Sequence, residues 1–286
     1  MRIAHCQFET WVGEFEHNLK RVEEGLARAE AERAEIVSFP ECFLTGYPDT
    51  EDPARRGAFT VDSAELMKVL DLTNRFDPTL IVGFNELRGA DLYNTALVAN
   101  RGHLLGIYSK CAAYQKFHKQ GRTFPVFERS GVKFGVIICA DGGYIEPARI
   151  LALKGARIIF APHFNSISGD GVLAHFMKVR SDHTARAIEN SVWFVRGNNV
   201  VLNAAKSGLS YQGVGYGDSY ILDPGGEIVV RSRRHVEDFI VADIDATRGP
   251  DMFWGMSKSA WSHREFGALL DQAMKESPYV GNRSGG

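Results

Sequence analysis

Three side chains in this sequence could together carry out acyl transfer. They are a carboxylate, an ammonium group and a thiol, at Glu41, Lys110 and Cys139, and each ends a short apolar run typical of a buried strand. Loops that leave a strand place functional groups on a rigid scaffold, so we expect the three side chains at the mouths of different strands. They supply the base, the cation and the nucleophile that acyl transfer through a thioester needs.

Each of the three residues also has a purely structural interpretation. Glu41 can be a surface carboxylate at a strand end, Lys110 a surface lysine with its stem on apolar neighbours, and Cys139 a buried thiol. The turn after Cys139 contains Gly142 and Gly143 and leads into a predicted helix. Because a helix N-terminus favours the thiolate, we expect this turn to lower the pKa of the Cys139 thiol. The three residues together favour catalysis.

The elements that must position these residues alternate between strand and helix patterns. Apolar runs predict strands at residues 2–8, 35–39, 80–84, 92–98, 104–108, 134–139, 157–161, 192–195, 220–222, 227–230 and 239–244. Helical spacing predicts helices at residues 16–32, 147–154, 174–190 and 263–275. Turn residues predict hairpins at Asn100-Arg101-Gly102 and at Asp223-Pro224-Gly225-Gly226. This order predicts one α/β domain over residues 1–286, with mixed sheets.

Composition and charge exclude several classes of function. The chain has 286 residues and a net charge of −2, so no global field favours nucleic acid or a membrane surface. We expect the one basic run, residues 231–234, to be a solvated hairpin end. The N-terminus lacks the pattern of a signal peptide, and no apolar run approaches the ~18 residues of a membrane span, which predicts a cytoplasmic protein. None of the four cysteines forms a C-x-x-C pair, which argues against a zinc site.

The motifs around the three candidate residues resemble those of the nitrilase superfamily of carbon–nitrogen hydrolases. The resemblance covers roughly residues 1–246. Two later segments, 186–190 and 217–226, are similar to the family's helix below the site and to its late hairpin. The three motifs that carry the resemblance are Phe39-Pro40-Glu41 with Thr45-Gly46-Tyr47, Tyr108-Ser109-Lys110, and Ile138-Cys139-Ala140-Asp141 with Tyr144-Ile145-Glu146.

The resemblance implies a fold and a mechanism. The fold is a four-layer α-β-β-α sandwich that forms homodimers or larger homo-oligomers across its helical face. Cys139 is the nucleophile, and Glu41 is a general base that later returns the proton. Lys110 and the backbone N–H of Ala140, the residue after Cys139, hold the oxyanion. The resemblance implies a small-molecule substrate and no metal or organic cofactor.

The substrate-binding residues are predicted less directly. Many relatives carry a second active-site Glu beyond the lysine, but residues 111–120 contain no acid, so Gln115 or His118 could take that role. Tyr144 lies in the third motif. His163 and Asn165 follow the strand after the Cys139 helix, so they either bind the polar end of a substrate or belong to a solvated loop.

Other residues have structural predictions. We expect Trp193 in the core, Arg186 and Glu189 as an ion pair, and Asn198 and Asn199 in a turn. The tail at residues 250–286 is predicted to lie at an oligomer interface. Four bulky side chains support that prediction, namely Phe253, Trp254, Met256 and Trp261.

Three functions remain open at this point. The leading hypothesis is an amidase or carbamoylase that acts on a small linear amide or N-carbamoyl compound. The second is a nitrilase, because the same three residues serve both reactions. The third is a catalytically inactive binding or scaffold protein, since a fold does not imply a function.

Overall fold

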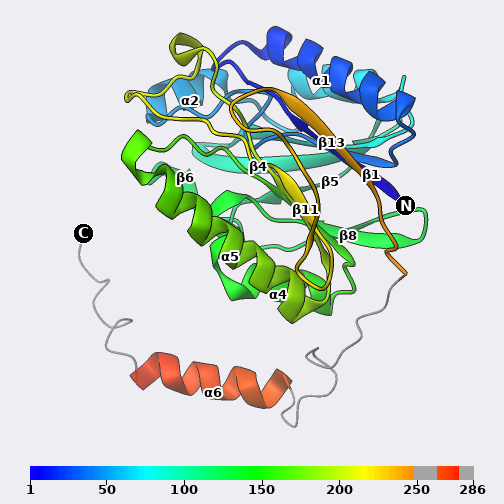
Figure 1. The fold of residues 1–286 in the computed structure, drawn as a ribbon. Helices are drawn as coiled ribbons and strands as arrows, with labels where there is room; N and C mark the ends of the chain where they lie inside the picture. The colour runs from blue at the N-terminus through cyan, green and yellow to red at the C-terminus, as the bar shows by residue number, and fades with distance from the viewer. Residues whose placement is uncertain (248–262, 277–286) are drawn as a thin grey trace.

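Two β-sheets are stacked face to face between helices. The computed structural model describes residues 1–247 and 263–276 (Figure 1). The first sheet has the order β13 (Asp238–Asp243), β1 (Arg2–Gln7), β2 (Ile36–Ser38), β3 (Thr79–Arg88), β4 (Asp91–Asn100) and β5 (His103–Ser109), with β6 (His118–Lys119) paired to β4. The second has the order β12 (Ile228–Arg231), β11 (Tyr220–Leu222), β10 (Trp193–Gly197), β9 (Ile158–Pro162), β8 (Val132–Val136) and β7 (Val126–Arg129).

Both sheets mix parallel and antiparallel pairs. Strands β1, β2 and β3 are parallel neighbours in the first sheet, as are β8, β9 and β10 in the second. The antiparallel pairs lie toward the edges, where hairpins join β3 to β4, β4 to β5 and β11 to β12. The parallel centre of each sheet is covered on both faces, as parallel strands require.

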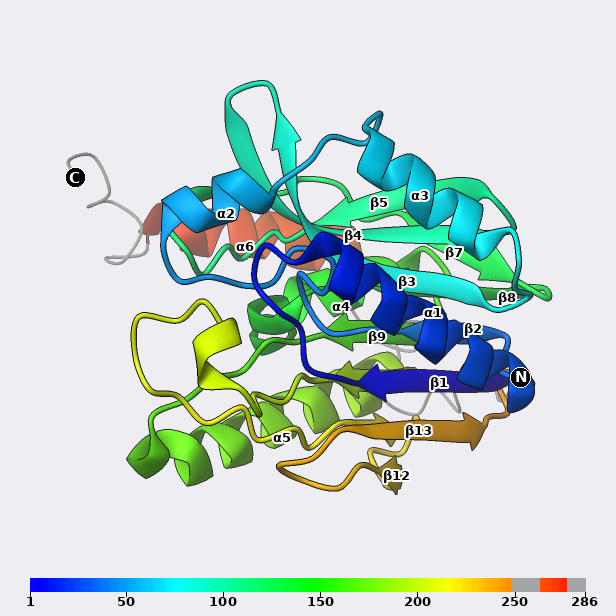
Figure 2. The same ribbon diagram turned by 90° about the horizontal axis from the view of Figure 1, so that it is seen from above.

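Helices cover the outer face of each sheet and complete four layers. Against the first sheet lie α1 (Phe15–Ala31), α2 (Glu51–Gly57) and α3 (Ala64–Thr73), and Figure 2 shows α1 and α3 across its strands. Against the second lie α4 (Ile145–Leu153) and α5 (Val172–Asn190). One apolar core fills the space between the sheets, and Trp193 belongs to it as predicted. The predicted four-layer sandwich is confirmed.

Local sequence explains several of these elements well. In α1, Val22, Leu26 and Ala29 recur at helical spacing and are fully buried against the first sheet. The turn between β4 and β5 has positive φ at Arg101 and Gly102, which fits the predicted hairpin there. Each predicted strand and helix has a counterpart in the structure, and the bounds differ by a few residues.

Several features differ from the sequence predictions. Helices α2 and α3 were not predicted, although the side chain of Ser63 caps α3 by accepting from the backbone N–H of Leu66. The strand predicted at residues 134–139 ends at Val136. It ends early because the chain turns into a short 3-10 helix, Cys139–Gly143.

The C-terminal helix α6 (His263–Glu276) forms where residues 263–275 predict it. Its residues 264–276 are all exposed, so its apolar side chains pack little on the described part of the chain. Phe253, Trp254, Met256 and Trp261 lie outside the described residues, so the interface at residues 250–286 stays a prediction. Within the described ranges, no helix is both long enough and apolar enough to cross a membrane.

Candidate active site

Cys139 stands on a strained turn at the start of the 3-10 helix. Its φ is 49°, in the left-handed region that residues other than glycine rarely adopt. Buried Asp141 holds the turn, because its Oδ2 accepts from the backbone N–H of Ile138 at 2.9 Å and from Tyr108 at 2.7 Å. Its Oδ1 accepts from the backbone N–H of Ala112 at 2.7 Å. Strain of this kind persists where the surroundings fix it, and it is common at active sites.

Glu41 and Lys110 form a buried ion pair. The Nζ of Lys110 lies 2.7 Å from Oε1 of Glu41, and both side chains are only 1% exposed. The same Oε1 accepts from Nδ2 of Asn94 at 2.7 Å, while Oε2 accepts from the backbone N–H of Phe164 at 2.9 Å. Both carboxylate oxygens therefore have donors, which a buried charge requires.

The charge state of Lys110 follows from this pairing. Burial is the largest single effect and lowers the pKa of Lys110, but the acidic groups around it, led by Glu41, together outweigh burial and raise that pKa well above its ordinary value. Lys110 is therefore a fixed cation beside the thiol. It can stabilise negative charge that develops on a bound substrate.

The Cys139 thiol is neutral in this environment. Burial raises its pKa to about 12, the nearby Glu41 carboxylate adds to the rise, and Lys110 acts in the opposite direction. The prediction that the glycine-rich turn lowers this pKa is therefore wrong, because burial and Glu41 outweigh the turn. A neutral thiol is a poor nucleophile, so attack at this position needs a base to remove the proton.

A cavity of about 540 Å³ opens above Cys139. Five of the six residues predicted to bind substrate line it, namely Gln115, Ala140, Tyr144, His163 and Asn165. The sixth, His118, lies behind this lining, where its ring contacts Tyr47 and its Nε2 donates to Asn85. Burial lowers the pKa of His118 to about 3, so it is neutral. Lys110 and Cys139 line the same cavity, which brings the predicted cation and nucleophile together.

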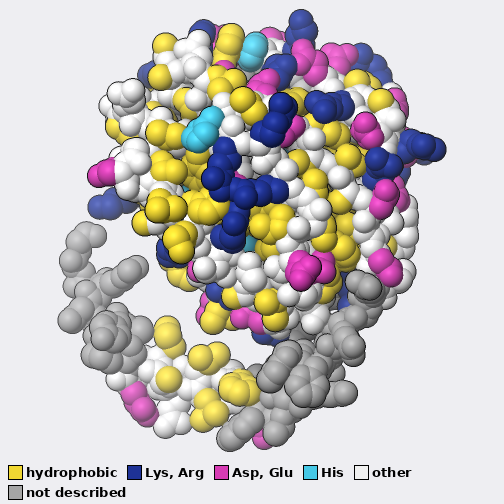
Figure 3. Space-filling view, in the orientation of Figure 1, with side chains coloured by type: hydrophobic (Ala, Val, Ile, Leu, Met, Phe, Trp, Pro, Cys, Tyr) yellow, Lys and Arg dark blue, Asp and Glu magenta, His cyan; other side chains and the backbone are white. Residues whose placement is uncertain are grey.

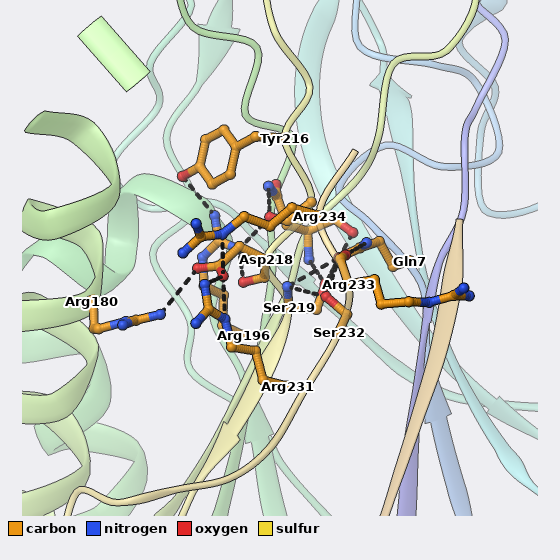
Figure 4. A network of polar contacts seen from close by, with 12 residues as sticks. Gln7, Arg180, Arg196, Tyr216, Asp218, Ser219, Arg231, Ser232, Arg233 and Arg234 are labelled. Carbon is orange, nitrogen blue, oxygen red and sulfur yellow. Dashed lines mark hydrogen bonds and ion pairs between the residues drawn. The ribbon is translucent and has the colours of Figure 1, made fainter. Parts of the chain in front are cut away.

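Asn165 connects the thiol to the protein core. Its Nδ2 lies 3.6 Å from Sγ of Cys139, and its Oδ1 accepts from Nη2 of Arg196 at 2.7 Å. Arg196 is almost completely buried and also donates to the carbonyls of Gly217 and Asp218 (Figure 4). Asn165 is therefore oriented from behind by a buried cation, which the sequence analysis did not identify.

The pair Asn198 and Asn199 supports the same residue. Their side-chain oxygens accept from the backbone N–H of Asn165 at 3.1 and 2.8 Å, and both residues are fully buried. We predicted turn residues at these positions. Their burial and shared partner give them a positioning role that a turn pattern alone does not indicate.

The arginines of the basic run at residues 231–234 form ion pairs that the sequence did not predict. Arg231 and Arg234 pair with the buried carboxylate of Asp218, which Arg180 of α5 approaches at 3.5 Å (Figure 4). Figure 3 shows basic side chains gathered on this face. Arg233 instead pairs with Asp238. Arg231, Arg233 and Arg234 are exposed, as expected for a solvated hairpin end, and the pairing of Arg231 and Arg234 with Asp218 also joins the hairpin to α5. The predicted ion pair of Arg186 and Glu189 is present.

Comparison with known proteins places these features in context. A family model for carbon-nitrogen hydrolases matches residues 2–250. A nitrilase of Pyrococcus abyssi is 28% identical, with 86% of this chain and 90% of the relative covered. The N-carbamoylputrescine amidase of Arabidopsis thaliana is 29% identical, with 84% and 85% covered.

Two further matches extend this comparison. A glutamine-dependent NAD(+) synthetase of Thermotoga maritima is 28% identical over 86% of this chain, but the chain spans only 42% of that relative. Among solved structures, a mutant of the Nesterenkonia AN1 amidase has a TM-score of 0.72 at 23% identity, with 89% of this chain and 92% of that chain covered. That likeness agrees with the four-layer fold described above.

Proposed function

This chain belongs to the carbon–nitrogen hydrolase family, and we propose that it is a thiol amidohydrolase with Cys139 as its nucleophile. Its substrate is a small linear amide or an N-carbamoyl compound, cleaved with release of ammonia or an amine. One observation carries the proposal: a buried Glu41–Lys110 ion pair lies beside a neutral thiol at the floor of a cavity. The amidase named among the relatives supports an amide substrate.

The first half of the reaction forms a thioester. Because the pKa of the Cys139 thiol is about 12, Glu41 removes its proton as sulfur attacks the substrate carbonyl. Negative charge then develops on the carbonyl oxygen. The Lys110 ammonium group and the backbone N–H of Ala140 stabilise that charge in a site with little water, where such interactions are strong.

The second half releases both products. Glu41, now protonated, gives its proton to the leaving nitrogen, and the carbon–nitrogen bond breaks. Water then attacks the thioester, with Glu41 as its general base, and the acid leaves as the thiol is restored. Asn94 and the backbone N–H of Phe164 hold the carboxylate in one orientation through both halves. These steps use no metal or organic cofactor.

A nitrilase reaction is the second candidate. The same nucleophile can attack a nitrile carbon, and the Pyrococcus abyssi relative carries the name nitrilase. A nitrile gives an acid and ammonia, whereas an N-substituted amide gives an amine. An unsubstituted amide also gives an acid and ammonia, so the substrates that turn over, and not the products alone, separate the two reactions. An inactive binding protein would give neither product.

The experiment is a product assay on a panel of small amides, N-carbamoyl compounds and nitriles. The wild-type protein is compared with Cys139→Ala and with the control Cys111→Ser, which removes another partly exposed thiol. We expect turnover of at least one amide or carbamoyl compound, its loss in Cys139→Ala and its retention in Cys111→Ser. Turnover confined to nitriles would establish the second candidate, and turnover that survives Cys139→Ala would refute both.

We also propose that the protein forms a homodimer or larger homo-oligomer and works in the cytoplasm. The helical face of the second sheet supports the first part, because α4 and α5 leave apolar side chains exposed there. These side chains are Ile145, Leu153, Leu173, Met177 and Ile188. The cytoplasm keeps thiols reduced, which suits a cysteine nucleophile.

A further inference from the structure

We infer that the substrate carries an alkylammonium group, which Asp49 binds in the same cavity that contains Cys139. This inference rests on the proposed function for the reacting end of the substrate and adds a requirement at its other end.

Asp49 lines the cavity, and one of its two carboxylate oxygens has no hydrogen-bond donor. Its Oδ2 accepts from the backbone N–H of Ser210 at 3.0 Å and from the Ser210 hydroxyl. Its Oδ1 is shielded from solvent and has no hydrogen-bond partner. Among residues 1–247 and 263–276, no basic side chain lies within ion-pair distance of Asp49, although many carboxylates in those ranges have one. A partly buried carboxylate without a cationic partner is disfavoured, and an ammonium group bound in the cavity would supply that partner.

The charge of the cavity favours a cation. Lys110 is neutralised by Glu41, and Lys178 by Asp182, which leaves the charge of Asp49 without a counter-ion in the lining. The histidines of the lining do not alter this balance at neutral pH. Burial lowers the pKa of His175 to about 4 and those of His163 and His183 well below the ordinary value. The cavity therefore attracts a cationic ligand and repels an anionic one.

Aromatic side chains line the same cavity, and one of them, Tyr211, lies near Asp49. Tyr114, Tyr144 and Tyr211 all line the cavity and are largely exposed. Tyr211 lies close to Asp49 and Tyr114. Burial raises the pKa of Tyr211, and the nearby Asp49 and Tyr114 add to that rise. The hydrogen bond from the Tyr211 hydroxyl to the Ser166 carbonyl acts in the opposite direction. Aromatic faces attract an ammonium group, so these rings favour the binding of a cation in the cavity that Asp49 lines.

A second unsatisfied polar atom lies in the same wall. Ser166 lines the cavity and is 7% exposed, and its hydroxyl has no hydrogen-bond partner. Its backbone carbonyl accepts from the Tyr211 hydroxyl at 2.7 Å, so it is part of the same cluster. Asp49 and Ser166, both in the cavity lining, thus each carry one polar atom without a hydrogen-bond partner.

The cavity is also large enough for an extended substrate. A volume of about 540 Å³ is typical of sites for ligands much larger than a two-carbon amide. Tyr47 connects the two ends, because its ring lies 5.9 Å from Nζ of Lys110 and Asp49 follows it by two residues. The Cα atoms of Tyr47 and Asp49 are therefore at most about 7.6 Å apart. Cys139 and Asp49 line this one cavity, and its volume can hold an amide with a few methylene groups between its two ends.

Binding to the inactive Cys139→Ala variant tests this inference without turnover. Three linear amides of matched length are titrated by calorimetry: 5-aminopentanamide, which is cationic, hexanamide, which is neutral, and adipic acid monoamide, which is anionic. We expect the cationic amide to bind at least about 10-fold more tightly than the neutral one, as a hydrogen bond to a charged group provides. The anionic amide is expected to bind most weakly.

Two further substitutions in the Cys139→Ala background identify the carboxylate. Asp49→Asn keeps the shape of the side chain and removes its charge, so the preference for the cationic amide should disappear. Asp52→Asn is the matched control, since Asp52 is exposed on α2 three residues away and does not line the cavity. It should leave the preference unchanged.

The outcomes separate this inference from the proposed function. Equal binding of cationic and neutral amides, no binding of the cationic amide, or a preference that survives Asp49→Asn would each overturn the inference. Hydrolysis of neutral amides that depends on Cys139 would still support the proposed function in those cases. Conversely, a cationic preference that Asp49→Asn abolishes would stand even if no amide were hydrolysed.

Discussion

Lys110 donates to Oε1 of Glu41 over 2.7 Å, and neither side chain has appreciable contact with solvent. Two opposite charges thus occupy the core at the base of the cavity. Such a pair is costly to bury and contributes little net stability, so its presence points to a role in the reaction. Its effect on the protein can be tested separately from catalysis.

The first prediction concerns this ion pair. Lys110→Met keeps the length of the side chain but leaves Glu41 buried without a counter-ion. We expect a loss of roughly 3–5 kcal/mol in the free energy of unfolding, measured by urea denaturation. The double variant Lys110→Met with Glu41→Gln should recover much of that stability and remain inactive. An unchanged unfolding free energy in the single variant would contradict the buried pair.

The second prediction concerns the turn that carries Cys139. Asp141→Asn replaces an oxygen that accepts two hydrogen bonds with a group that donates, so the turn at Cys139 should relax. We expect kcat to fall by roughly 100-fold, since a small misplacement of a reacting group has effects of this size. Tyr108→Phe removes only one of the donors and should reduce kcat less. Equal effects of the two substitutions would indicate that the phenolic bond, and not the turn, is what matters.

The third prediction is a loss of stability in acid. Burial lowers the pKa values of His5 and His118 to about 3 and that of His175 to about 4, below the ordinary 6.5. The unfolded chain therefore binds protons that the native chain does not, so stability is full above about pH 6.5 and falls as the pH is lowered toward 4. Each such histidine contributes a slope of up to about 1.4 kcal/mol per pH unit.

Urea denaturation between pH 7.5 and 4 measures that slope. His118→Gln removes one titrating group and keeps a donor for Asn85, so the pH dependence should be flatter in this variant. His103→Gln is the control, because His103 is exposed on β5. If the unfolding free energy of the wild type did not change over this range, the histidines would not be buried in their neutral form.

The fourth prediction concerns assembly. Placing glutamate at both Leu153 and Leu173 puts charge on the exposed apolar face of α4 and α5, so we expect a smaller particle by light scattering after size-exclusion chromatography. The control Leu105→Glu places the same charge at an exposed leucine on β5. Wild-type protein that is already monomeric at micromolar concentration would refute the proposed oligomer.

The elements that the sequence predicted well are those whose signals are local. Helix α1 has its apolar residues at regular spacing, and the turn at Asn100-Arg101-Gly102 favours the β4–β5 hairpin. Helices α2 and α3 were missed. Helix α2 is short, and the signal for α3 is a serine cap with a modest apolar stripe. The strand predicted before Cys139 was too long, because the apolar residues continue past the point where the backbone turns.

The site was predicted less completely, since much of it depends on contacts between distant residues. The motifs indicated Glu41, Lys110 and Cys139, but not that Asn94 binds Glu41 or that Arg196 orients Asn165. The shift in the pKa of Cys139 was predicted in the wrong direction for the same reason. The turn is visible in the sequence, whereas burial and the charge of Glu41 arise only from the fold.

The most direct test of the central claim is to identify the acylated residue during turnover. The wild-type protein is mixed with a linear amide that it hydrolyses, quenched in acid within the first turnovers, digested and mapped by mass spectrometry. We predict the acyl group of the substrate on the peptide that contains Cys139, and no such adduct in Cys139→Ala. Two results would contradict Cys139 as the nucleophile. One is an acyl group on any other residue, and the other is hydrolysis that gives no adduct and persists in Cys139→Ala.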